Sequence, residues 1–108
     1  MEQPTIYIIP TFNTQAVTLI TNTILTEVQM YNVALQNDEP VSVPSGRTRG
    51  QLLVAAQQSY IETWKWMDTP RLSQHLSKQD FEVLESVVNA LEHLLLSGTV
   101  GLKPKEVL

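Results

Sequence analysis

The chain has 108 residues, of which 43% are apolar and 17% are charged, and its formal net charge is −4. These proportions predict one folded domain over residues 1–108 and argue against disorder. The absence of cysteine excludes disulfides, thiolate metal sites and cysteine nucleophiles, and the acidic total argues against sequence-independent binding to nucleic acid.

The start of the sequence does not have the pattern expected of a secretory signal. Residues 1–4 lack the basic region that opens a secretory signal, and the longest apolar runs are far shorter than the ~20 residues of a membrane span. We therefore expect a cytoplasmic protein that does not bind a membrane.

Residues 1–12 have the pattern of an extended arm. Thr5–Ile9 is β-branched and aromatic and lies between Pro4 and Pro10, which is typical of a short strand. A strand of this length needs a pairing partner, which is residues 41–43, the tail after Gly98 or another copy of the chain. The candidate contact residues for a partner in this arm are Ile6, Tyr7 and Ile8.

Residues 13–36 are predicted to form the first long helix. Apolar side chains recur there at steps of three and four, the period of one helix face: Val17, Ile20, Ile24, Val28, Tyr31 and Leu35. The many threonines lower the helix propensity, so the alternative is a hairpin that turns at residues 21–23 and makes the fold α+β. The adjacent apolar pairs Leu19-Ile20 and Ile24-Leu25 spoil strand alternation and favour the helix.

Residues 37–50 form a predicted loop that ends at a helix start. Thr48 is expected to cap a helix that runs to about Met67, with Gln51 completing a capping box. Two arginines and two glycines come at this start, where free backbone N–H groups attract anions. The loop is therefore a candidate site for a small phosphorylated or other anionic ligand, and its alternative is a solvated turn. The candidate residues are Ser45, Gly46, Arg47, Thr48 and Arg49.

The end of this second helix concentrates large aromatic side chains. Trp64 falls on the predicted core stripe, which also contains Leu53, Ala56, Tyr60 and Met67. Trp66 lies about 200° around the helix from Trp64, so we expect it to face outward and, with Arg71, to contact a partner. The alternative is that another part of the chain covers it.

Two more helices follow in the prediction. Thr69 can cap, and Pro70 begin, a short helix that runs through Leu76. Ser77 starts a longer helix that Gly98 ends, and residues 99–108 are expected to be a partly mobile tail. The predicted buried stripe of the longer helix is Phe81, Leu84, Val88, Leu91 and Leu95, widened by Val87 and Leu94.

The sequence contains no catalytic or metal-binding motif. His75 and His93 have no carboxylate at a suitable helical spacing, and zinc needs three or four ligands. We expect no enzyme activity, no metal and no cofactor.

The predicted fold is mainly α, with three longer amphipathic helices and one short helix in a small bundle. Such a bundle has a thin core, which self-association often completes. The leading hypothesis is a small interaction, assembly or accessory module that forms a homo-oligomer or holds a protein partner. The alternative is a binding protein for a small phosphorylated ligand, and nucleic-acid binding comes third because the chain is acidic.

Overall fold

The computed structural model describes residues 12–100, and within them the chain forms four helices and no strand. The helices are α1 (Thr14–Gln36), α2 (Arg49–Asp68), α3 (Pro70–Ser73) and α4 (Lys78–Ser97). The prediction of a mainly α fold is confirmed, and residues 14–36 form one helix rather than a hairpin. The predicted strand in the N-terminal arm lies outside the described residues.

α1 forms in spite of its threonines, and two of their hydroxyls bond within the helix, whereas the Oγ1 atoms of Thr14 and Thr21 are buried without a partner in residues 12–100. Asn13 caps the helix, since its Oδ1 accepts the backbone N–H of Ala16 at 2.9 Å. The hydroxyls of Thr18 and Thr23 donate to the carbonyls four residues earlier, at 2.8 and 2.9 Å. These groups bond within the helix instead of competing with it from outside.

The start of α2 agrees with the prediction, whereas α3 is shorter than expected. Thr48 and Gln51 form a reciprocal capping box at the start of α2. Pro70 is the first residue of α3, but α3 ends at Ser73 and the Thr69 side chain makes no capping hydrogen bond. Thr69 therefore separates two helices by its extended backbone and not by its hydroxyl.

α4 has a signal at each end. The Ser77 Oγ accepts the backbone N–H of Asp80 at 3.0 Å, and the Asp80 carboxylate lies in the first turn, where the helix dipole favours it. Gly98 ends the helix with φ of 71°, and its N–H donates to the carbonyl of Leu94 at 2.7 Å. A residue with a side chain is strained in this left-handed conformation, so glycine suits the position.

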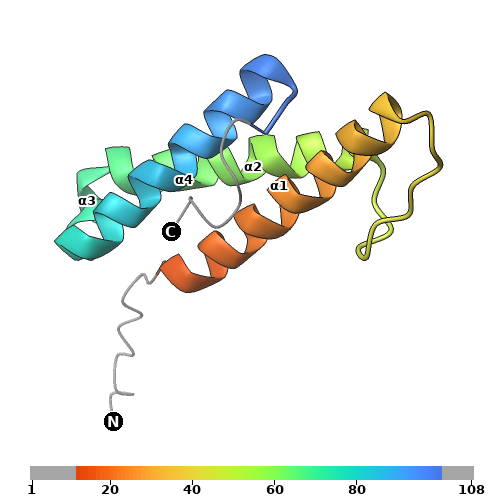
Figure 1. The fold of residues 1–108 in the computed structure, drawn as a ribbon. Helices are drawn as coiled ribbons and strands as arrows, with labels where there is room; N and C mark the ends of the chain where they lie inside the picture. The colour runs from red at the N-terminus through yellow and green to blue at the C-terminus, as the bar shows by residue number, and fades with distance from the viewer. Residues whose placement is uncertain (1–11, 101–108) are drawn as a thin grey trace, which may run out of the picture.

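The three long helices contact one another, and the core lies between them (Figure 1). α3 lies at the end where α2 passes into α4, and the loop of residues 37–48 lies at the other end (Figure 1). The main buried cluster draws on all three helices and consists of Ile24, Leu25, Val28, Leu52, Ala56, Val87, Ala90, Leu91 and Leu94. A smaller cluster consists of Met67, Leu84 and Val88, with Phe12, Val17, Tyr60, Leu76 and Phe81 packed against it.

The buried face of α1 differs from the predicted stripe. Ile20 is 52% exposed and Leu35 is 71% exposed, although both belong to the stripe. Leu25, which lies outside the stripe, is fully buried. α1 contacts both α2 and α4, so two neighbours determine which side chains it buries.

Candidate interaction surface

The loop predicted to bind an anion already holds a carboxylate of the chain itself. Glu27 of α1 is only 2% exposed and lies beneath Ser45. Its carboxylate accepts the Ser45 backbone N–H at 2.9 Å and also accepts the Ser45 hydroxyl. The Ser45 Oγ in turn accepts the backbone N–H of Arg47 at 3.2 Å. The Ser45 donors that were expected to bind an external anion therefore bind the Glu27 carboxylate instead.

Arg49 is likewise turned toward the protein. Its Nε donates to the Asn32 Oδ1 at 2.9 Å, and its Nη2 donates to the carbonyl of Gly98, which also accepts the Asn32 side-chain amide. One guanidinium thus joins the start of α2 to α1 and to the end of α4. Bidentate donation of this kind is a geometry that arginine provides and lysine does not.

The other residues of the predicted anion site divide between structure and solvent. Thr48 is the capping residue of α2, and Gly46 adopts φ of 71° in the turn. The backbone carbonyl of Arg47 accepts the Tyr31 hydroxyl. The Arg47 guanidinium is exposed and has no hydrogen-bond or ion-pair partner within residues 12–100. Of the five residues, Arg47 is the one whose charge faces outward.

The two tryptophans exchange the positions expected of them. Trp66 is 8% exposed and stacks on Phe12, with the ring centroids 5.1 Å apart, whereas Trp64 is 40% exposed. The outward orientation predicted for Trp66 is wrong, because Phe12 and the neighbouring core cover its ring. Arg71 is exposed on α3. The other predicted contact residues, Ile6, Tyr7 and Ile8, lie outside the described residues.

α1 presents a broad exposed face without charge, which the sequence patterns did not reveal. We call it the outer face of α1, and it covers about 120° of the helix circumference. Leu19 is 68% exposed, Val33 47% and Met30 36%. Glu27 is the only charged residue of α1, and it is buried. The outer face consists of Gln15, Leu19, Asn22, Thr23, Thr26, Gln29, Met30 and Val33.

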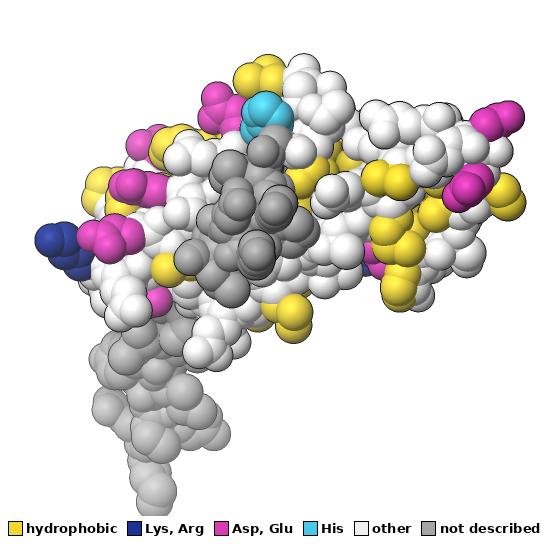
Figure 2. Space-filling model, viewed as in Figure 1, with side chains coloured by type: hydrophobic (Ala, Val, Ile, Leu, Met, Phe, Trp, Pro, Cys, Tyr) yellow, Lys and Arg dark blue, Asp and Glu magenta, His cyan; other side chains and the backbone are white. Residues whose placement is uncertain are grey.

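Four hollows of about 240 to 500 Å³ lie along this face. Leu19 borders two of them, and Met30 borders the other two, so each is a ridge with a hollow on either side. Figure 2 shows apolar side chains gathered over the C-terminal half of α1 and the following loop, with acidic side chains at the far end of this region. The surface is therefore uncharged, partly apolar and uneven.

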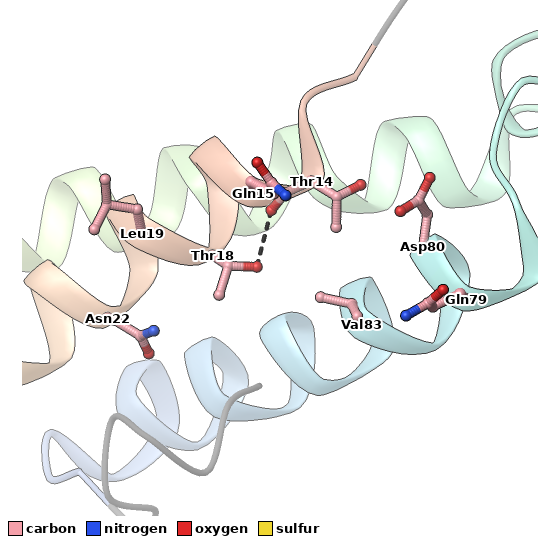
Figure 3. A pocket seen from close by; sticks show the side chains of 8 residues that line it. All are labelled: Thr14, Gln15, Thr18, Leu19, Asn22, Gln79, Asp80 and Val83. Atoms are coloured by element: carbon pink, nitrogen blue, oxygen red, sulfur yellow. Dashed lines mark hydrogen bonds between the residues drawn. The ribbon is translucent and has the colours of Figure 1, made fainter.

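The largest of these hollows lies between α1 and α4. Figure 3 shows Thr14 and Thr18 on α1 facing the turn of α4 that carries Gln79 and Val83, with Asn22 farther along α1 on the side toward α4. The Oγ1 of Thr14 and the Oδ1 of Asn22 are buried and have no hydrogen-bond partner within residues 12–100. A buried polar atom without a partner costs free energy.

The sequence held one signal that points to the outer face. α1 is atypical of a solvated helix. Its exposed side carries Leu19, Met30 and Val33, and its one charged residue between positions 14 and 36 is Glu27. Sequence periodicity assigned apolar residues to the core and left these three unexplained. Their positions became clear only when the neighbours of α1 were known.

The two histidines are exposed and far apart in the sequence, at positions 75 and 93. Residues 12–100 contain no group of three or more metal-ligating side chains. None of the helices in this part of the chain is both long and apolar enough to cross a membrane.

The chain was also compared with known proteins. No family model, no curated protein and no solved structure matches it.

Proposed function

We propose that this chain is a protein–protein interaction module that binds its partner through the outer face of α1. The observation that carries the proposal is the exposure of Leu19, Met30 and Val33 on a helix with no exposed charge. Large apolar side chains exposed together on an uncharged face are a feature of interaction sites.

Burial of this face is energetically favourable. Fully burying one Leu, Val or Met side chain contributes about 1.5–3 kcal/mol, so covering the exposed parts of Leu19, Met30 and Val33 is worth a few kcal/mol. No ion has to lose its water, which is the main cost of burying a charged surface.

The other exposed surfaces fit this role less well. The outward side of α4 carries Glu82, Glu85 and Glu92, which are exposed and keep that helix solvated. α2 exposes Ile61 and Trp64, but the charged Glu62 and Lys65 lie beside them and none of the four hollows borders them. The outer face of α1 combines apolar exposure, absence of charge and surface relief.

The alternative function, capture of a phosphorylated ligand by residues 45–49, has weaker support. Glu27 occupies the donors of Ser45, and Arg49 is bonded to Asn32 and Gly98. An added phosphate has to displace a buried carboxylate that bears the same sign of charge. Arg47 alone is a weak basis for such a site.

Site-specific photocrosslinking in the native cells tests the proposal. A benzophenone amino acid replaces Leu19 or Met30 on α1, and the matched controls carry it at Ile61 on α2 or Glu85 on α4. We expect discrete protein adducts from the two α1 positions, with the crosslinked peptides identified by mass spectrometry, and loss of these adducts in the Thr26→Glu background. Adducts from Ile61 with none from α1 would overturn the proposal.

A further inference from the structure

We infer that the partner is a second copy of this chain, docked antiparallel through the outer face of α1 about a twofold axis at Thr26. This inference rests on the proposed function and names the partner and the geometry of that same surface. Three features support it: the distribution of charge, the spacing of ridges and hollows, and the charged residues at the edge.

The distribution of charge leaves few surfaces on which two copies can meet. Each chain carries a formal net charge of −4, so two copies repel one another over most of their surface. A twofold interface brings the same surface of both copies together, and any acid at its centre then faces its own image. The centre of the outer face of α1 avoids this problem because Glu27, the only acid of α1, is buried and bonded to Ser45, and the acids that border its hollows, Asp80 and Glu39, lie at its edges.

The spacing of residues along α1 is nearly symmetric about Thr26. Leu19 and Val33 each lie seven residues from Thr26, which is about 10 Å along the helix. In an antiparallel pair, Leu19 therefore meets the partner's Val33, and Asn22 meets the partner's Met30, both four residues from Thr26. The small Thr26 side chains face each other at the axis and allow close approach.

Each half of the outer face contains one ridge, although Leu19 lies seven residues and Met30 four residues from Thr26. Leu19 stands between two hollows in one half of the face, and Met30 stands between two hollows in the other half. Antiparallel pairing sets the ridge of one half beside the hollows of the other half. Ridges packed into grooves are the usual geometry of helix–helix contacts.

The charged residues at the edge favour the antiparallel orientation. Arg47 borders the hollow that Leu19 and Ile20 line, and Glu39 borders the hollow that Met30 and Val33 line. Arg47 and Glu39 belong to the same loop, and each borders a hollow that α1 also lines. Antiparallel pairing places Arg47 opposite the partner's Glu39, so the edge is complementary in charge. A parallel pair puts the two loops on opposite flanks and loses this contact.

Single cysteines map the orientation directly. The natural chain has no cysteine, so any disulfide in a single-cysteine variant joins two copies. We expect Thr26→Cys to form a crosslinked dimer on mild oxidation, because a disulfide requires Cα atoms about 4.4–6.8 Å apart. Leu19→Cys and Val33→Cys should fail to crosslink alone but should crosslink when the two variants are mixed. Crosslinking of all three variants alone indicates a parallel pair and overturns the inference.

Sedimentation of the full chain tests the association and its charged edge. The chain should sediment at micromolar concentration with the mass of two copies, and Thr26→Glu should reduce this to one copy while the helical circular dichroism is kept. Asn89→Glu, which introduces the same charge on the exposed side of α4, should remain a dimer.

The charged edge is tested by reversing its charges. Arg47→Glu or Glu39→Arg should each raise the dimer Kd about tenfold, because one exposed ion pair changes the Kd up to several-fold and the twofold dimer contains two such pairs. The double variant should restore the original Kd.

The two proposals fail in different ways. A chain that is a monomer at 100 μM and gives photoadducts from Leu19 and Met30 to a different protein overturns the dimer but supports the interaction module. An intramolecular adduct to residues 1–11 shows that the face is covered by its own chain, and it overturns both.

Discussion

The bond between Glu27 and Ser45 should hold the loop of residues 37–48 against α1. Glu27 is the only charged side chain among the buried residues described, at 2% exposure. Both of its carboxylate oxygens accept hydrogen bonds from Ser45, one of them from the backbone N–H at 2.9 Å. Replacing the carboxylate leaves this part of the loop without its attachment to α1.

The expected cost of Glu27→Ala is about 2 kcal/mol in the free energy of unfolding. A hydrogen bond to a charged group contributes about 1.5–3 kcal/mol, and two are lost. The loss is partly offset because Ser45 is exposed, so water can accept from its donors, and because the variant no longer buries a carboxylate. Glu27→Gln should cost about 1 kcal/mol, since its amide can accept the Ser45 N–H and donate to the Ser45 Oγ while only the charge is lost.

Urea denaturation at fixed protein concentration measures both effects. With a slope of about 1–3 kcal/mol/M for a chain of this size, Glu27→Ala should lower the midpoint by about 1 M with the slope unchanged. Ser45→Ala should cost less in the Glu27→Ala background than in the natural chain, which shows that the two residues are coupled. A midpoint for Glu27→Ala equal to or above that of the natural chain would refute the reasoning, because burial of the carboxylate would then outweigh its hydrogen bonds.

Two further predictions concern Arg49 and the tryptophans. Arg49→Lys should lower the Tm by about 5–10 °C, because one ammonium cannot donate to both Asn32 and the Gly98 carbonyl in this geometry. The expected loss in the free energy of unfolding is about 1–2 kcal/mol. An unchanged Tm in thermal denaturation contradicts this role of Arg49. Trp66→Ala should cost about 3–5 kcal/mol in urea denaturation, as large core deletions do, whereas the exposed Trp64 should lose less than about 1 kcal/mol on the same change. Equal costs for the two variants would show that the assignment of the buried ring is wrong.

The ends of the helices could be predicted from the sequence because they depend on neighbouring residues. The capping box of Thr48 and Gln51 and the left-handed Gly98 involve contacts within about one helical turn. Thr69 is an exception, since its predicted side-chain cap is not formed. Local chemistry thus marks where a helix starts or ends but does not guarantee each bond.

The buried faces were predicted less well because they depend on neighbouring helices. Leu84, Val88 and Leu91 of α4 lie in one strong apolar stripe, and all three are buried as predicted. α1 and α2 carry apolar residues on more than one side, so periodicity did not distinguish the exposed Ile20 from core residues or the buried Trp66 from surface ones. The outer face of α1 escaped prediction for the same reason.

The sequence by itself predicted four helices with their approximate ends and favoured the mainly α class, since helical period and capping act over a few residues, but it left a hairpin over residues 13–36 as the alternative. Tertiary structure alone decided the roles of Glu27 and Arg49. Glu27 meets Ser45 18 positions away, and Arg49 meets Gly98 49 positions away. No local pattern encodes such pairs, because they arise only when the helices pack. Because the helices pack in this way, the residues of the predicted anion site form hydrogen bonds within the protein, and an uncharged face of α1 stays exposed.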